Sequence, residues 1–173
     1  RRPDASERLK VLDFGIAKLL ADPNAGALQL TQFGGCALTP RYAAPEQMCG
    51  EPITTLTDVY ALGVVLHELL TSSPPYDFNS LDHASIAHMA MVVLHAEPMR
   101  PSAARLDATV AQARGVASIK HLRSEFAGDL DTVVGKALRK KPAERYASIE
   151  RFGKDIASYL ALRPIEARPP SMA

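Results

Sequence analysis

The stretch Thr57–Leu70, with the sequence TDVYALGVVLHELL, decides the fold of this chain. Between residues 59 and 70, only His67 and Glu68 are strongly polar. A helix that is apolar on nearly every side is buried on several sides, so this pattern predicts a helix at the centre of the structure. We expect the hydroxyl of Thr57 to cap its N-terminus and Asp58 to lie favourably near the positive end of the helix dipole.

The chain downstream is predicted to be helical as well. The central helix should end near Thr71, before a pair of prolines, and apolar residues recur at helical spacing over His83–His95 and Asp129–Arg139. Ser148 is expected to cap a last helix. The segment Met99–Phe126 shows no clear period, and we expect a loop there with no more than one turn of helix.

The N-terminal part follows a different pattern. Leu9–Asp13 alternates in polarity and stops before Gly15, which predicts a short strand that runs into a turn. Residues 16–45 have no sustained period and are interrupted by glycines and prolines, so they are predicted to form a long loop. A loop of that length in a compact domain is usually functional or disordered. The predicted fold class is therefore mainly α, with one short β segment ahead of the loop.

Length, charge and cysteine content narrow the class of protein. A chain of 173 residues, 47% of them hydrophobic, fits one globular domain. Its formal net charge of +1 does not favour a nucleic-acid partner, because phosphate binding depends on concentrated positive charge. Its two cysteines form neither a disulfide framework nor a four-ligand zinc site. No stretch is apolar for long enough to cross a bilayer, and residues 1–8 carry no apolar signal segment. We therefore expect a cytoplasmic segment without membrane contact.

Several short motifs follow one another along the chain. Asp13-Phe14-Gly15 ends the predicted strand, and Ala44-Pro45-Glu46 closes the long loop. The series is completed by TPRYAAPE at Thr39–Glu46, TDVYALG at Thr57–Gly63 and PAERY at Pro142–Tyr146. In this order, the motifs make the chain resemble the C-terminal lobe of a serine/threonine protein kinase. The ending Arg163–Pro169 looks most like the bacterial branch of that family.

This resemblance implies a domain organisation and a set of partners. Residues 1–162 would form part of the family's two-lobed α+β kinase domain, and residues 163–173 a proline-containing linker or tail. The glycine-rich loop, the nucleotide-binding lysine and the catalytic aspartate of the family are not found in the sequence. We expect the missing N-lobe to belong to the same polypeptide, with ATP, Mg²⁺ and protein substrates bound by the complete kinase. A downstream span could tether the full-length protein to a membrane.

The resemblance also implies roles for the triplet that ends the predicted strand and for residues of the long loop. Asp13 matches the ligand that holds Mg²⁺ on the nucleotide phosphates, Phe14 would set its orientation by packing, and Gly15 would permit the turn. Thr31 lies where phosphorylation orders the loop, and Thr39 where a threonine contacts the catalytic aspartate. Plainer interpretations remain open, namely a strand-ending turn residue for Asp13 and an ordinary loop residue for Thr31.

Further residues match the substrate platform and the structural charges of the family. The segment that seats a substrate peptide corresponds to Thr39, Pro40, Arg41 and Tyr42. Glu46 and Arg145 match an ion pair that ties the end of the loop to the helical body, the alternative being two exposed charges. Asp58 would accept backbone N–H groups from the catalytic loop, or serve as a helix-start aspartate, and both can hold.

Two functions remain open on the sequence. By resemblance, the protein is an ATP-dependent serine/threonine protein kinase that transfers the γ-phosphoryl group to protein hydroxyls, and this chain alone would be inactive. The alternative is a non-catalytic, kinase-like binding or scaffold module. The presence of Asp13 favours the enzyme, because a pure scaffold has no need of a magnesium ligand.

Overall fold

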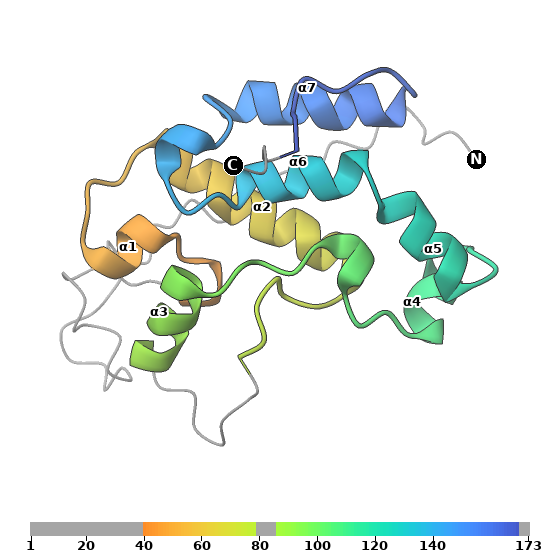
Figure 1. Cartoon of the computed structure of the whole chain (residues 1–173), viewed down its shortest axis with the longest axis horizontal. Helices are drawn as coiled ribbons and strands as arrows, with labels where there is room; N and C mark the ends of the chain where they lie inside the picture. The colour runs from red at the N-terminus through yellow and green to blue at the C-terminus, as the bar shows by residue number, and fades with distance from the viewer. Residues whose placement is uncertain (1–39, 79–85, 170–173) are drawn as a thin grey trace, which may run out of the picture. The chain divides into compact units, whose positions relative to one another are not determined.

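The helix α2 (Thr55–Thr71) occupies the central position that its apolar pattern predicts (Figure 1). It packs against α6 (Asp129–Ala137) and α7 (Ile149–Leu160), and these three helices lie side by side. Val59 and Tyr60 of α2 have no exposed surface. The core of the structure is therefore built around this helix.

The computed structural model describes residues 40–78 and 86–169, all within one unit of the chain that covers residues 39–173. No strand occurs among these residues, and the fold is mainly α, as predicted. The strand predicted over Leu9–Asp13 lies outside the described residues. The remaining elements are α1 (Pro45–Cys49), α3 (Ile86–His95), α4 (Ala108–Ala113), α5 (Ile119–Phe126) and the 3₁₀ turns η2 (Pro40–Tyr42), η3 (Pro101–Ala103) and η4 (Pro142–Glu144).

The N-terminus of α2 differs from the prediction that Thr57 caps it. The helix begins at Thr55, and its cap is Thr54, whose hydroxyl accepts the N–H of Leu56 at 3.2 Å. Thr57 instead accepts the N–H of Thr54 at 3.2 Å through its own hydroxyl. Three threonines within four positions offered alternative caps, and the reciprocal bond between Thr54 and Thr57 selects the earlier one.

The prediction of a loop over Met99–Phe126 is wrong. Helices α4 and α5 lie within this segment, capped by Asp107, which accepts the N–H of Val110 at 2.9 Å, and by Ser118. Both helices are too short to show a clear period in the sequence, and such helices depend on tertiary packing. That packing comes from a separate cluster of buried side chains, which includes Leu122 and Phe126.

The last helices are close to their predicted bounds. Ser148 caps α7 as predicted, since its hydroxyl accepts the N–H of Arg151 at 3.4 Å. Helix α6 ends at Ala137 rather than Arg139. Helix α3 ends at His95, as predicted, and the part of its predicted range before residue 86 lies outside the described residues.

The boundary predicted for a linker at residue 163 is too early. Ile165 and Ala167 are buried in the cluster that also contains Phe152 of α7. Asp155 of α7 holds this segment by accepting the backbone N–H groups of Glu166 at 2.7 Å and Ala167 at 2.9 Å. The prolines suggested a linker. Instead, the alternating apolar side chains Ile165 and Ala167 pack into the core, and Asp155 accepts the backbone N–H groups of this segment.

Asp155 should make the stability of the chain depend on acid pH. Burial alone would raise the pKa of Asp155, but hydrogen bonds from Glu166, Ala167 and the hydroxyl of Tyr146 favour the ionised form and lower the pKa overall. The unfolded state then binds more protons at acid pH, so this stabilisation is complete above a pH of about 4 and is lost below it. We expect Asp155→Asn to lower the free energy of unfolding at pH 7 by about 1–3 kcal/mol.

Urea denaturation at a series of pH values measures this effect. The variant should also lose less stability than the wild type between about pH 4 and pH 2, because the titrating group is gone. An equal loss of stability in the two proteins over this range would contradict the role of Asp155.

Gly63 allows α2 and α6 to approach each other closely. A Cβ atom at this position would lie 2.9 Å from the Cβ of Ala137 and 3.2 Å from Cδ2 of Leu138. We expect Gly63→Ala to lower the free energy of unfolding by about 1–3 kcal/mol through overpacking. Gly135→Ala in α6 is the matched control, because a Cβ there meets nothing within 4 Å. Because alanine has a higher helix propensity than glycine, Gly135→Ala should stabilise the chain by up to about 1 kcal/mol. Equal effects of the two variants on the free energy of unfolding in urea denaturation would contradict the close approach of α2 and α6.

Candidate functional site

Helix α1, which follows the predicted long loop, is attached to the helical body by a buried ion pair. Arg145 Nη1 and Nη2 lie 2.7 Å from Oε1 and Oε2 of Glu46, so the contact is bidentate. The two side chains are 0% and 2% exposed. Glu46 belongs to the first turn of α1, and Arg145 directly follows the turn η4. The pairing expected from the sequence is therefore present, and the alternative of two exposed charges is wrong.

Every other polar atom of this pair also has a partner. The remaining N–H groups of Arg145 are donated to the carbonyl oxygens of Arg139 at 2.7 Å, Leu56 at 2.9 Å and Lys140 at 3.0 Å. The hydroxyl of Thr57 donates to Oε1 of Glu46 at 2.9 Å. A buried charge is tolerated when its partners are complete, so this one guanidinium holds α1, the start of α2 and the segment around η4 together.

The protonation state of the pair follows from its surroundings. Burial alone would raise the pKa of Glu46, but the hydrogen bonds from Arg145 and Thr57 outweigh it and lower the pKa below its ordinary value. Glu46 is therefore ionised at neutral pH. The guanidinium also lies over the ring of Tyr60, with 4.9 Å between Cζ and the ring centroid, which adds a cation–π contact.

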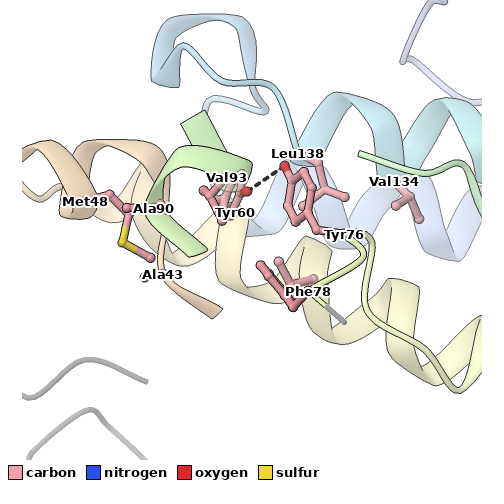
Figure 2. Packing of buried hydrophobic residues seen from close by; sticks show 11 residues of the cluster. Ala43, Met48, Tyr60, Tyr76, Phe78, Ala90, Val93, Val134 and Leu138 are labelled. Atoms are coloured by element: carbon pink, nitrogen blue, oxygen red, sulfur yellow. Dashed lines mark hydrogen bonds between the residues drawn. The ribbon is translucent and has the colours of Figure 1, made fainter. Parts of the chain in front are cut away.

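A chain of polar groups, buried at Tyr60 and Tyr76 and half-buried at Lys140, extends from this pair toward α3. The hydroxyl groups of Tyr60 and Tyr76 are 2.8 Å apart, and the dashed line in Figure 2 marks the hydrogen bond between them. Lys140 Nζ donates to the Tyr76 hydroxyl at 2.8 Å and to the carbonyl oxygen of Val93 in α3 at 2.5 Å. Burial raises the pKa of Tyr76 to about 12, so this hydroxyl stays neutral. Sequence reasoning missed Tyr60, Tyr76 and Lys140, because no spacing relates residues so far apart in the chain.

Two residues of the predicted substrate platform are held by one carboxylate of α2. Glu68 forms an ion pair with Arg41 Nε at 2.8 Å and accepts the hydroxyl of Tyr42 at 2.9 Å. The hydrogen bond to Glu68 raises the pKa of Tyr42. Glu68 was not among the predicted site residues. Its only sequence signal was a charge within an apolar helix, which a partner on a neighbouring segment explains.

The other predicted site residues are placed as follows. Asp13, Phe14, Gly15, Thr31 and Thr39 lie outside the described residues. Pro40 begins the turn η2. Asp58 is exposed in the first turn of α2, a position that suits a helix-start aspartate. Its predicted contact with a catalytic loop remains a prediction.

The described residues hold neither a metal-ligand cluster nor a helix suited to a membrane. Across residues 40–78 and 86–169, no group of three or more histidine, cysteine, aspartate or glutamate side chains is arranged to hold a metal ion. Within the same ranges, no helix has the length and apolar character that crossing a membrane requires.

The buried pair should matter far more for stability than an exposed pair. Glu46→Gln leaves the Arg145 charge buried without its counter-ion, which we expect to cost about 3–5 kcal/mol. Glu144→Gln is the control, because it breaks the pair with Lys141, which is 3.6 Å long and has side chains 49% and 80% exposed. The control should change the free energy of unfolding by about 0–1 kcal/mol. Equal losses in urea denaturation of the two variants would contradict this difference.

Comparison with known proteins agrees with the motifs. The family model described as Protein kinase domain matches residues 3–154. The serine/threonine-protein kinase PknB of Mycobacterium tuberculosis is 32% identical over 163 residues, which cover 94% of this chain and 22% of PknB. The serine/threonine-protein kinase PknH of Mycobacterium bovis is 33% identical over 163 residues, which cover 26% of PknH.

The matches cover nearly all of this chain but only part of each relative. The chain covers about a quarter of the length of these curated relatives, and nearly all of it is matched. The matched region contains both the Asp13-Phe14-Gly15 triplet and the residues of the buried Glu46–Arg145 pair. The motifs, the helical fold and these matches show that the chain belongs to the protein kinase family, and the relatives it resembles are bacterial serine/threonine kinases.

Proposed function

We propose that the protein containing this chain is an ATP-dependent serine/threonine protein kinase, and that the chain supplies part of its C-terminal lobe. The observation that carries the proposal is the kinase-domain match over residues 3–154, within which the motifs occur in the family's order. The relatives named serine/threonine-protein kinase support this choice of acceptor. The reaction is transfer of the γ-phosphoryl group of ATP to a protein hydroxyl.

The described residues are suited to holding a peptide acceptor. Glu68 fixes the side chains of Arg41 and Tyr42, and the pair of Glu46 with Arg145 fixes the helix that follows them. A preorganised platform reduces the entropy lost when two reactants are brought together. We therefore assign the seating of the substrate peptide to residues 40–42, together with Thr39.

The nucleotide end of the reaction is assigned to the N-terminal part of the chain and to elements upstream of it. When bound, Mg²⁺ neutralises the charge that develops on the transferred phosphoryl group. Asp13 is proposed as its ligand, with Phe14 and Gly15 setting the conformation of this triplet and Thr31 as a site of regulatory phosphorylation. The glycine-rich loop, the lysine and the catalytic aspartate must come from elsewhere, so the chain by itself should not transfer phosphate. The reaction draws on ATP, which favours a cytoplasmic location for this part of the protein.

The proposal is tested in the complete kinase, in which the chain is joined to its N-lobe and catalytic loop. Asp13→Ala should lower the rate of phosphoryl transfer from radiolabelled ATP to a serine- and threonine-containing peptide by at least roughly a hundred-fold, because developing charge loses its counter-ion. Asp22→Ala, which removes a carboxylate nine residues further along the chain and outside the motif, should leave the rate within about two-fold.

Two results would overturn the proposal. Unchanged transfer in Asp13→Ala would remove the metal role of this residue. Absence of transfer by the complete wild-type protein in the presence of Mg²⁺ and ATP would favour the alternative, a kinase-like scaffold without catalysis.

A further inference from the structure

The ion pair between Arg41 and Glu68 has two ends that differ in exposure. Arg41 Nε lies 2.8 Å from one carboxylate oxygen of Glu68, and the hydroxyl of Tyr42 donates to the other oxygen at 2.9 Å. The side chain of Arg41 is 48% exposed, whereas that of Glu68 is only 19% exposed. The cation is therefore the end of this pair that solvent, or a bound peptide, can reach.

The anionic end of the pair is already occupied. Because each oxygen of Glu68 has a partner, a basic side chain of a substrate would have to displace Arg41 or Tyr42 to reach this carboxylate. The guanidinium is different, since it carries five N–H groups in a planar fork and the pair is made through Nε. The Nη groups of such a fork are suited to binding a second carboxylate.

The helices around Arg41 add no further acidic group at this place. The turn η2 packs against α2 and α3. The sequence of α3, IAHMAMVVLH, contains two histidines and no aspartate or glutamate. In α2, the other acidic residue is Asp58, which lies ten positions before Glu68 and therefore about 15 Å away along the helix axis. The exposed charge of residues 40–42 is therefore positive.

We propose that Arg41 gives the kinase a preference for acidic substrates, in which a carboxylate lies close to the acceptor serine or threonine. The inference rests on the proposed function, which places the acceptor peptide on residues 39–42. The Nη groups of Arg41 bind the peptide carboxylate while Nε stays paired with Glu68. A basic peptide residue at the same place meets the exposed guanidinium and is repelled, so the contact also selects against basic sequences.

This contact should act on substrate binding. Arg41 is assigned to holding the peptide and not to the transferred phosphoryl group, and an interaction of equal strength in the ground state and the transition state changes KM while kcat stays the same. The guanidinium is partly exposed, so one peptide carboxylate should lower KM by roughly two- to five-fold relative to a neutral amide. Added salt should reduce this difference, because exposed charges are screened.

The test uses the complete kinase and sets of serine- and threonine-containing peptides. Within a set, the peptides differ at one position near the acceptor, which is glutamate, glutamine or lysine. Steady-state kinetics give kcat and KM for each peptide. We expect glutamate to lower KM relative to glutamine at one or more positions, and lysine to raise KM there. Equal KM values for the three peptides at every position would overturn the acidic preference.

Three variants assign the preference to Arg41. The measurement in each protein is the ratio of KM for the glutamine peptide to KM for the glutamate peptide, which does not depend on the overall level of activity. Arg41→Gln should bring this ratio to about one or below, because the cation is lost and Glu68 is left without its counter-ion. Arg41→Lys keeps the positive charge and should keep the ratio above one.

Arg163→Gln is the matched control, because it removes an exposed arginine that follows α7 and lies outside residues 39–42. It should keep the wild-type ratio. A wild-type ratio in Arg41→Gln would overturn the role of this residue, and a ratio of one in Arg41→Lys would overturn the electrostatic basis of the preference.

The outcomes separate this inference from the proposed function. If the wild-type kinase phosphorylates the peptides without regard to the charge beside the acceptor, the proposed function stands and the acidic preference is overturned. If it phosphorylates no peptide of any set, the proposed function is overturned, and the preference with it.

Discussion

The guanidinium of Arg145 is the group on which the described structure depends. It is fully buried, and a buried charge is stable only when its counter-ion and all its hydrogen-bond acceptors are in place. Those partners come from α1, from the start of α2 and from the segment around η4. Because the partners must be present together, these segments have one arrangement relative to each other, and the position of Glu46 is fixed.

The polar chain through Tyr60, Tyr76 and Lys140 extends this constraint to α3. Each hydroxyl in it is buried and each has a partner, so the chain adds specificity to an otherwise apolar cluster (Figure 2). Lys140 stands at its outer end, where it donates to the carbonyl oxygen of Val93 in α3. The same lysine thus connects α3, through the two tyrosine hydroxyl groups, to the region of the buried pair.

The residues proposed for the substrate platform and the buried pair depend on the same helix. Glu68 of α2 holds Arg41 and Tyr42, while Thr57 at its other end donates to Glu46. A helix that is apolar on most sides is rigidly buried, so it is a suitable support for polar side chains that must keep their positions. In a protein kinase, residues that position substrates need such a support.

The sequence by itself determined the central helix, the last helices, the family and the pairing of Glu46 with Arg145. The apolar run predicted the central helix, and capping residues and spacing predicted the last helices. The ordered motifs indicated the family and, with it, the ion pair. Short-range patterns predict the helices because periodicity and capping are local. The pairing of Glu46 with Arg145, which are 99 residues apart, was instead implied by the resemblance of the ordered motifs to the kinase family.

Only the tertiary structure decided the cap at Thr54, the helices within Met99–Phe126, the packing of Ile165 and Ala167, and the roles of Glu68 and Lys140. Which of several similar hydroxyl groups caps a helix depends on the hydrogen bonds that its neighbours make. Helices as short as α4 and α5 form only when they pack against a core. A charged side chain gains its role from partners distant in the chain. No spacing in the sequence places Lys140 against Tyr76 and Val93, because that contact exists only once the helices are packed.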